Sequence, residues 1–496
     1  MLLSRLQDLA ARQPQLPALQ YQQGIVGYGE LYAAVQAAAE DLCAQDISCL
    51  GLLMDNSPSW VIMDLAALAA GITVVPLPGF FSGTQIGHVI QEAGIDALCT
   101  DMEPLQEWPG FAAGDPPVPS TRLYVATGAQ PVRRYPAGTA KITFTSGTTG
   151  RPKGVCLDTG AMFAVADSIV RLTDGCGIQN HTCLLPLSLL LENIAGVYAP
   201  LLAGASIALP GSEERGLHGS RQLDLEKLFQ CLHRYRPDSL VLVPQMLKAL
   251  TQACGHGLSV NDNLRFVAVG GARVAGGLLD AARRAGLPAY EGYGLSEAAS
   301  VVSLNMPGHE RAGSAGRPLP HVRLKIADDG EILVSGSSLL AYTGQPPRGE
   351  SWYATGDLGH IDADGFLFIT GRRKNLFVTA YGRNVNPEWP ESELARFPEI
   401  AQAVVFGEAR EHNVAVILPA SDRLPDPFIE RCIDEANAEL PDYARVHGWV
   451  RAREAFTADN GLLTNSGKPR RDAIWNRYQA VIEADDLSNA VTRNVC

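Results

Sequence analysis

Ile142-Thr143-Phe144-Thr145-Ser146-Gly147-Thr148-Thr149-Gly150-Arg151-Pro152-Lys153-Gly154-Val155 is the stretch on which the interpretation of the whole chain depends. Apolar residues that favour strands lead into small hydroxylated residues and glycines, and a lysine follows. Small residues allow backbone N–H groups and hydroxyls to surround phosphate oxygens, which bulky side chains would keep away. The spacing is not the Walker A pattern G-x-x-x-x-G-K-[ST]. The stretch therefore predicts a phosphate-binding loop of another fold family, with a plain solvent-exposed turn as the alternative.

The order T-S-G-T-T-G-x-P-K-G is more specific than the composition of the loop. It resembles the phosphate-binding motif of the adenylate-forming (AMP-binding) superfamily, and the chain as a whole resembles the medium- and long-chain fatty acyl-CoA synthetase branch most. The resemblance implies that the loop binds the phosphates of ATP through Thr145, Ser146, Gly147, Thr148, Thr149, Gly150 and Lys153.

Composition and charge limit the classes of partner. The chain has 496 residues, of which 46% are hydrophobic and 19% charged, and its net charge is −13. A globular protein of several domains is expected from this length. Nucleic acid is not expected as a partner, because phosphate backbones recruit basic surfaces.

The ten cysteines form no C-x-x-C pair, so we expect them to be reduced and mostly buried. The chain shows neither a signal-peptide pattern nor an uninterrupted apolar run long enough to cross a membrane. We therefore expect a cytoplasmic protein without a transmembrane segment. The oligomeric state is open between a monomer and a homodimer.

Helical and strand patterns alternate along the first part of the chain. Alternation of this kind indicates an α/β fold with a doubly wound, mostly parallel sheet. A loop rich in Pro and Gly is expected at 103–140, before the phosphate motif. The expected helices are 31–42, 60–70 and 245–250, and the expected strands are 48–54, 72–77 and 239–243.

A second group of residues lies between 267 and 297. Glycines at strand ends let a planar base lie against the backbone, and a tyrosine offers it an aromatic face. The resemblance implies that Ser296 contacts the α-phosphate and that Glu297 holds Mg²⁺, for which a carboxylate oxygen is a suitable ligand. An isolated Glu would by default be a solvated surface residue. The nucleotide-binding residues implied here are Gly271, Ala272, Tyr293 and Gly294.

An apolar region at 184–209 contains the sequence Leu-Pro-Leu-Ser. Taken alone, it is best read as hydrophobic core. In the family it begins the pocket for the acid, and there Leu189 stands where a histidine is usual. No aspartate is present to bind an α-ammonium group. The region therefore favours a fatty or otherwise hydrophobic acid over an amino acid, with aryl acids also open.

A third group follows at Thr355-Gly356-Asp357. An acidic side chain on a turn after a strand binds ribose hydroxyls in dinucleotide folds, although an isolated Asp in a turn is more often a capping residue. By resemblance, Asp357 and Arg372 bind the ribose, and Arg383 occupies a further basic position of the site. The predicted organisation is an N-terminal adenylation domain at 1–371, a hinge at 372–374 centred on Lys374, and a small mobile α+β cap domain at 375–496.

The last group is Thr464-Asn-Ser-Gly467-Lys468. A basic cluster is by default a solvated face. The pattern resembles the catalytic lysine loop of the superfamily, which implies that Lys468 neutralises charge that builds up between the carboxylate and the α-phosphate, together with Ser296 and Glu297 as catalytic residues.

The resemblance implies an acid–thiol ligase that uses ATP and Mg²⁺. A carboxylate would attack the α-phosphorus of ATP to give acyl-AMP and pyrophosphate, and the thiol of CoA would then displace AMP. Three alternatives stay open at this point: an acyl-AMP ligase that loads the phosphopantetheine of an acyl carrier protein, an oxygen-using luciferase-type enzyme, and a degenerate nucleotide-binding scaffold. The scaffold would have lost Glu297, Asp357 or Lys468, and all three are present.

Overall fold

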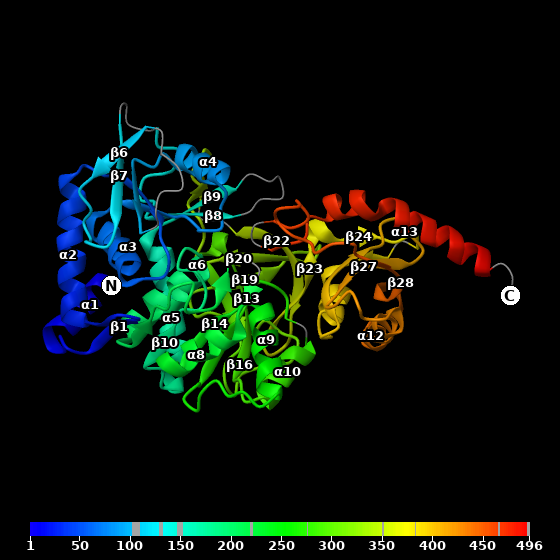
Figure 1. Ribbon diagram of the computed structural model, residues 1–496. Helices are drawn as coiled ribbons and strands as arrows, with labels where there is room; N and C mark the ends of the chain where they lie inside the picture. The colour runs from blue at the N-terminus through cyan, green and yellow to red at the C-terminus, as the bar shows by residue number, and fades with distance from the viewer. Residues whose placement is uncertain are drawn as a thin grey trace. The chain divides into compact units, whose positions relative to one another are not determined.

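The computed structural model describes the chain except residues 102–109, 128–131, 146–151, 219–221, 275, 350–351, 382, 465–466 and 494–496. It forms two units, each made of several segments (Figure 1). Unit 1 comprises Met1–Ala272, Ala281–Leu324 and Leu333–Tyr353, and unit 2 comprises Arg273–Asp280, Lys325–Ile332 and Ala354–Cys496. The predicted hinge at 372–374 lies inside unit 2, so it stays a prediction.

The first large sheet of unit 1 has nine strands, and its central strands are parallel. The strands at both edges pair antiparallel. In spatial order they are β18 (Arg317–Pro318), β17 (Ser300–Leu304), β16 (Ala289–Leu295), β15 (Phe266–Val269), β14 (Ser239–Leu242), β10 (Asn180–Thr182), β11 (Ser206–Ala208), β1 (Pro17–Tyr21) and β2 (Gly24–Gly27).

The second large sheet has eight strands, and it carries the phosphate motif between β8 and β9. Strands β8, β4, β3 and β5 are parallel, and the outer strands are antiparallel. In spatial order they are β21 (Ala341–Tyr342), β9 (Lys153–Leu157), β8 (Lys141–Thr145), β4 (Thr73–Pro76), β3 (Cys49–Leu53), β5 (Ala97–Thr100), β7 (Arg122–Ala126) and β6 (Phe111–Gly114).

Helices connect and cover these strands. The helices α1, α2 and α3 pack on one another in sequence order at one side of unit 1 (Figure 1). The helices are α1 (Leu2–Arg12), α2 (Tyr28–Ala44), α3 (Pro58–Ala70), α4 (Gly83–Ala93), α5 (Thr159–Thr173), α6 (Leu190–Glu192), α7 (Ala199–Ala203), α8 (Leu225–Tyr235), α9 (Pro244–Gly255) and α10 (Gly276–Arg284), with a short hairpin of β12 (Leu217–His218) and β13 (Gln222–Leu223) before α8. The α/β fold predicted from the sequence is confirmed.

The predicted helices and strands agree with the structure, with one correction. Helices expected at 31–42, 60–70 and 245–250 correspond to α2, α3 and α9, and the strands expected at 48–54, 72–77 and 239–243 correspond to β3, β4 and β14. The expectation of a plain loop at 103–140 is wrong, because β6 and β7 form an antiparallel pair that extends the second sheet from β5. The many Pro and Gly residues around these short edge strands concealed them.

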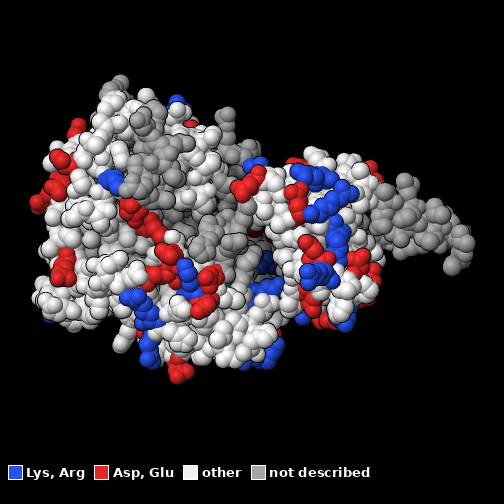
Figure 2. Space-filling view, in the orientation of Figure 1, with Lys and Arg blue, Asp and Glu red and all other residues white. Residues whose placement is uncertain are grey.

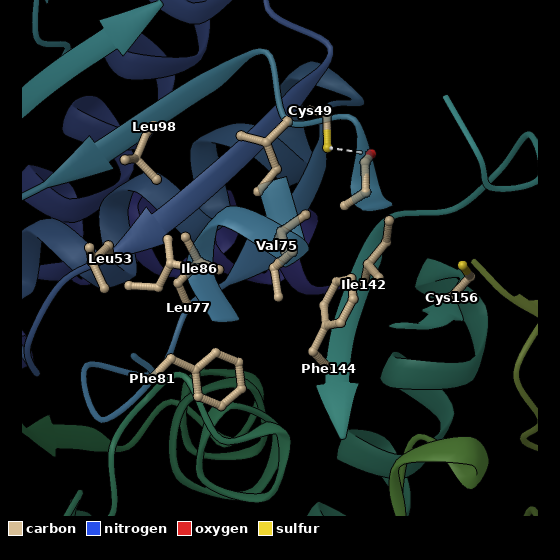
Figure 3. Close-up of a cluster of buried hydrophobic side chains, with 13 residues drawn as sticks. Cys49, Leu53, Val75, Leu77, Phe81, Ile86, Leu98, Ile142, Phe144 and Cys156 are labelled. Carbon is tan, nitrogen blue, oxygen red and sulfur yellow. Dashed lines mark hydrogen bonds between the residues drawn. The ribbon is translucent and has the colours of Figure 1, made fainter. Parts of the chain in front are cut away.

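Strand β8 is buried on both faces, which positions the phosphate motif. Ile142 and Phe144 point into a hydrophobic cluster with Val75 of β4 and Phe81 (Figure 3). Alternate residues of a strand face opposite sides, so Lys141, Thr143 and Thr145 share the other face. The strand that ends at Thr145 is therefore held from both sides at the point where the phosphate motif begins.

Unit 2 contains a four-stranded sheet in the order β19 (Arg323–Ile326), β20 (Glu331–Ser335), β22 (Tyr353–Ile361) and β23 (Leu367–Arg372), of which β19, β20 and β22 begin or end in unit 1. A two-stranded pair and a three-stranded sheet follow. They are β24 (Phe377–Val378) with β25 (Asn384–Val385), and β26 (Ile400–Phe406), β27 (Asn413–Pro419) and β28 (Val446–Arg451), accompanied by α11 (Glu388–Leu394), α12 (Asp426–Ala438) and α13 (Arg471–Arg493).

The three-stranded sheet of unit 2 is covered on both faces. Ala415 and Ile417 of β27 pack in one cluster with residues of α11 and α12, whereas Val414 and Val416 pack in a second cluster with residues of α13. Helices α12 and α13 accordingly lie on opposite sides of this sheet (Figure 1). The period of two along β27 explains why this strand is apolar at nearly every position.

Cysteine burial was also predicted. On the face shown in Figure 2, acidic and basic side chains are both present, and some of the acidic groups have no basic side chain beside them. All nine described cysteines are free, and six of them are buried, as expected. In the part of the chain that the structure describes, no helix combines the length and the apolar character needed to cross a bilayer.

Candidate active site

The phosphate motif joins two antiparallel strands. Thr145 at the end of β8 pairs directly with Lys153 at the start of β9, and the Lys153 side chain is exposed. Ser146, Gly147, Thr148, Thr149 and Gly150 lie outside the described residues. The structure thus places the two described members of the predicted phosphate-binding set next to each other at the two ends of the loop.

The predicted adenine-binding residues gather at the ends of β15 and β16. These strands are parallel, with Val269 opposite Glu291. A Cβ atom on Gly270 would lie 3.4 Å from the carbonyl oxygen of Gly292, and Gly271 has φ of +83°, a conformation that glycine adopts without strain. Gly271 and Ala272 are exposed and Tyr293 is half-buried. The structure therefore brings Gly271 and Ala272 to the end of β15, beside the strand that carries Tyr293.

Glu297 lies on a 3₁₀ turn, Ser296–Ala298, that follows β16 directly. Gly294 allows this turn to fold back, because a Cβ atom there would come within 1.7 Å of the Ser300 carbonyl oxygen. Ala299 and Ser300 have φ of +53° and +96°, which side chains other than glycine rarely adopt. Such strain is concentrated at functional sites, where the surrounding structure enforces it.

Two hydrogen bonds from β21 and the residues before it hold Glu297. The Tyr342 hydroxyl donates to Glu297 Oε1 at 2.9 Å, and the Leu339 N–H donates to the Glu297 carbonyl oxygen at 2.7 Å. Among the described residues, the hydrogen bonds to this carboxylate reach only Oε1. A half-buried carboxylate with a second oxygen available is a suitable donor for Mg²⁺, so the residues present fit this ion.

Glu297 and the phosphate motif also belong to one local structure. Tyr342 pairs with Val155 of β9, two residues after Lys153, and the turn Ser296–Ala298 packs against β9. The predicted magnesium ligand and the strand that leaves the phosphate motif are therefore adjacent, although about 140 residues separate them in sequence.

Most of the apolar region at 184–209 is core, as its composition indicated. Leu184, Leu187 and Ile194 are fully buried. Leu189 and Leu191 are half-buried, and Leu191 Cδ2 lies 4.0 Å from the position of a Cβ atom on Gly270. Leu191 therefore lies beside the end of β15.

In unit 2, Asp357 and Arg372 form an ion pair. They are opposite each other on β22 and β23, and Arg372 Nε donates to Asp357 Oδ1 at 2.7 Å. The Asp357 side chain is almost fully buried, and its backbone N–H donates to Thr355 Oγ1. The two residues predicted to bind the ribose are thus brought together, with the arginine partly exposed.

The residues around the predicted hinge also belong to unit 2. Arg373 pairs with Asp329 and with Glu331, the latter at 3.1 Å. Lys374 follows on the 3₁₀ turn Arg373–Asn375 and is exposed. Arg383 is exposed as well, and its backbone N–H donates to Thr379 Oγ1. Arg373 is therefore held by two acidic residues of unit 2, and the exposed Lys374 follows it.

Lys468 lies on a closed turn. Its backbone N–H donates to Thr464 Oγ1 at 3.0 Å, and its carbonyl accepts the Thr464 N–H at 2.7 Å. Leu463 and Pro469 form a β-bridge below the turn. The Lys468 side chain is exposed, so the described part of the turn presents a basic side chain to solvent.

Family comparison agrees with this geometry. Residues 6–341 match the model of the AMP-binding enzyme family, and residues 374–485 match the AMP-binding enzyme C-terminal domain. The first match alone covers more than half of the chain. The chain belongs to the AMP-binding enzyme family.

Several relatives of this AMP-binding enzyme are acid–CoA ligases. It is 26% identical over 526 residues to a long-chain-fatty-acid–CoA ligase of Mycobacterium bovis (86% of each chain). It is 27% identical over 507 residues to the indoleacetate–CoA ligase of Aromatoleum aromaticum (94% of this chain, 96% of the relative). A solved structure of o-succinylbenzoate CoA synthetase from Bacillus subtilis with its acyl-adenylate superposes with a TM-score of 0.74 at 23% identity (94% of this chain, 97% of the other). The structural likeness establishes the fold.

Sequence reasoning missed a buried ion pair next to the phosphate motif of this AMP-binding enzyme. Lys141 Nζ donates to Asp64 Oδ1 at 2.7 Å, to Asn193 Oδ1 and to the Tyr198 hydroxyl at 2.9 Å, and all four side chains are fully buried. Burial lowers the pKa of Lys141, and Asp64 opposes this shift. A lysine in an apolar strand and an aspartate in an apolar helix were the available signal, because such residues are rarely buried unless paired.

A second buried polar cluster joins β10 to the segment that precedes α7. His181 lies 3.1 Å from Glu192 Oε1 through Nε2, and 2.9 Å from Ser239 Oγ through Nδ1. Cys183 Sγ donates to the Gly196 carbonyl oxygen. Together with Asn193, which belongs to the first cluster, these contacts fix the apolar region on both sides of Glu192. We interpret the cluster as structural because each potential metal-binding residue in it already has a protein partner.

Proposed function

We propose that this AMP-binding enzyme activates a hydrophobic carboxylic acid with ATP and transfers the acyl group to the thiol of CoA. The adjacency of Glu297 to β9 in unit 1 carries this proposal, because it joins a magnesium-binding carboxylate to the strand that leaves the phosphate motif. The similarity to CoA ligases supports the choice of acceptor.

In the first step, a carboxylate oxygen attacks the α-phosphorus of ATP. A bond from that oxygen to phosphorus forms, the bond between the α-phosphorus and its bridging oxygen breaks, and pyrophosphate leaves with the bonding electrons. Thr145 and Lys153, with the loop between them, bind the departing pyrophosphate. Glu297 would hold Mg²⁺, which would supply positive charge against the phosphate oxygens. Ser296 contacts the α-phosphate, and Gly271, Ala272, Tyr293 and Gly294 surround the adenine.

In the second step, the thiol sulfur attacks the acyl carbonyl carbon and a carbon–sulfur bond forms. The thiol proton passes to solvent, and AMP leaves with the bonding electrons as the bond from carbon to the phosphate oxygen breaks. Asp357 and Arg372 bind the ribose in both steps, since ribose is common to ATP and acyl-AMP. Arg383 supplies positive charge near the nucleotide. After the first step, rotation of the C-terminal domain about Lys374 would move Lys468 away from the reacting groups before the thiol attacks.

The nature of the acid follows from the apolar region. Leu189, Leu191 and Leu202 are half-buried members of this region, and its one carboxylate, Glu192, is fully buried beside His181. The relatives act on acids that differ in shape, from long-chain fatty acids to indoleacetate and 2-succinylbenzoate. Apolar contact is what fatty and aryl acids share, so the proposal commits to a hydrophobic acid of either type.

Release of pyrophosphate over a panel of fatty, aryl, short polar and amino acids tests the substrate class. Fatty or aryl acids should give the highest kcat/KM. A preference for short polar acids or amino acids would refute the hydrophobic site. CoA and a phosphopantetheinylated carrier protein are then compared as acceptors, and transfer to the carrier alone would replace the CoA assignment by that of an acyl-AMP ligase.

Lys468→Ala tests the mechanism. A cation that bridges the carboxylate and the α-phosphate acts more strongly in the transition state than in the ground state, and the loss of one such group costs about 10²–10³ in rate. Acid-dependent exchange of pyrophosphate should fall by this factor, whereas supplied acyl-AMP and CoA should still give thioester. Arg470→Ala is the matched control, because Arg470 is an exposed basic residue beside the same turn. Equal losses in both half-reactions of a folded Lys468→Ala protein would contradict the assignment.

A further inference from the structure

Three side chains of unit 1 form a hydrogen-bonded row that ends at Glu297. The Tyr342 hydroxyl donates to Glu297 Oε1 at 2.9 Å and lies 2.9 Å from the Tyr353 hydroxyl. A phenol has one O–H group. Because Tyr342 uses its proton toward the carboxylate, Tyr353 is the donor in the bond between the two tyrosines. The row therefore has one direction, from Tyr353 through Tyr342 to Glu297.

The backbone around Tyr342 is tied to both parts of the site. On one side, Tyr342 pairs with Val155 of β9, and the Leu340 N–H donates to the Cys156 carbonyl oxygen at 2.8 Å. On the other side, the Leu339 N–H donates to the carbonyl oxygen of Glu297 itself. The position of the Tyr342 hydroxyl is consequently determined by the strand that follows the phosphate motif.

The bond from Tyr342 to Glu297 is of a strong kind. The Tyr342 hydroxyl donates to a carboxylate oxygen at 2.9 Å, and hydrogen bonds to a charged acceptor are stronger than those between neutral groups.

The strained turn gives a reason why Glu297 needs such support. Ala299 and Ser300 hold backbone conformations that residues other than glycine rarely adopt. A turn of this kind sets the direction in which the Glu297 side chain leaves the backbone, but it does not restrict rotation about the bonds of that side chain. A hydrogen bond to Oε1 restricts them and leaves Oε2 as the oxygen that a metal ion would meet. Mg²⁺ demands near-ideal octahedral geometry at short distances, so the orientation of each carboxylate matters.

We propose that Tyr342 is a positioning residue that holds Glu297 for monodentate binding of Mg²⁺ through Oε2, with Tyr353 supporting Tyr342. The inference rests on the proposed function, because it assumes that Glu297 is the magnesium ligand. Hydrogen-bond partners of this kind typically change metal affinity by about 10–100-fold when they are removed.

Tyr342→Phe, which removes one oxygen and keeps the ring, is the test. Binding of α,β-methylene-ATP, which the first step cannot cleave, is followed by calorimetry as a function of Mg²⁺ concentration. The Mg²⁺ concentration for half-maximal binding should rise about 10–100-fold, while binding of the analogue in EDTA should not change. In the pyrophosphate-exchange assay, high Mg²⁺ should restore much of the rate lost at low Mg²⁺.

Tyr28→Phe is the matched control. It also removes a buried tyrosine hydroxyl of unit 1, which donates to the Ala205 carbonyl oxygen at 2.7 Å in a different part of the structure. This variant should have a lower melting temperature and an unchanged Mg²⁺ midpoint. Tyr353→Phe should give a Mg²⁺ midpoint between those of the wild type and Tyr342→Phe, and it serves as the test if Tyr342→Phe does not fold.

The outcomes separate this inference from the proposed function. Glu297→Gln should raise the Mg²⁺ midpoint. If it does, but Tyr342→Phe leaves the midpoint within twofold of the wild type, Tyr342 has no positioning role and the proposed function stands. Tyr353→Phe is judged in the same way if Tyr342→Phe does not fold. If the wild type binds the nucleotide analogue without any dependence on Mg²⁺ and shows no acid-dependent pyrophosphate exchange, the proposed function fails, and this inference fails with it.

Discussion

The buried ion pair of Lys141 and Asp64 allows a quantitative prediction for Asp64→Asn. This change keeps the shape of the side chain but removes the negative charge 2.7 Å from the Lys141 ammonium. Breaking a buried pair by removing one partner typically costs about 3–5 kcal/mol. The loss of folding free energy is limited because Lys141 can lose its proton and become neutral. From its ordinary pKa of 10.5, neutralisation at pH 7 costs about 5 kcal/mol, since each pH unit corresponds to about 1.4 kcal/mol.

The pH dependence of this variant has a definite sign. Burial already lowers the pKa of Lys141 in the folded protein, and loss of Asp64 removes the main effect that opposes burial. The unfolded chain then binds a proton that the folded chain lacks, so stability rises with pH up to the ordinary pKa. The destabilisation by Asp64→Asn should accordingly shrink by up to about 1.4 kcal/mol for each unit between pH 7 and 9.5.

Thermal unfolding at pH 7.0 and 9.5 measures both effects. A cost of about 3–5 kcal/mol should lower the melting temperature of unit 1 by roughly 4–7 °C at pH 7, and the difference from the wild type should narrow at pH 9.5. Asp41→Asn, on the exposed face of α2, is the control and should change little. The double variant Asp64→Asn/Lys141→Met removes both charges and should be more stable than Asp64→Asn.

Two results would refute this reasoning. A melting temperature of Asp64→Asn within about 1 °C of the wild type at pH 7 would mean that the pair does not hold a buried charge. A difference from the wild type that widens between pH 7.0 and 9.5 would have the wrong sign for a lysine whose pKa is lowered by burial.

Three further variants test the proposed site. Glu297→Gln keeps the shape of the side chain but lacks the charge that Mg²⁺ needs, so turnover at limiting Mg²⁺ should fall, and unchanged turnover there would remove Glu297 from the site. Asp357→Ala should weaken both half-reactions, because ribose is present in ATP and acyl-AMP, and a loss in adenylation alone would contradict ribose binding. Lys374→Pro restricts φ at the hinge, so pyrophosphate exchange should largely survive while thioester formation is lost. Equal loss of both steps would indicate misfolding instead.

Local sequence patterns were sufficient for much of the fold. The helix α3 and the strands β3 and β4 were predicted because hydrophobic periodicity and the glycine at 71 are local signals. The ends of the phosphate motif, Thr145 and Lys153, also lie where the motif implies. In each of these cases, the residues that determine the structure are neighbours in the sequence.

Other features depend on residues that are distant in sequence. Nothing near Tyr342 in the sequence indicates that its hydroxyl reaches Glu297, because the contact depends on the pairing of β21 with β9. The buried partner of Lys141 likewise comes from a helix 77 residues earlier. The sequence shows Lys141 and Asp64 each within an apolar segment. It does not show that they pair, because the pair forms only when α3 packs against the sheet that contains β8.

The apolar region shows the same division. Its composition determined that 184–209 is buried, whereas only the packed structure decided that Leu189 and Leu191 are half-buried while Leu187 is not. Composition and period determine how much apolar surface a segment must bury, and these are properties of the segment alone. Which side chains stay accessible depends on the elements that cover the segment. The sequence by itself therefore determined the family, and tertiary packing decided which residues that are distant in sequence come into contact.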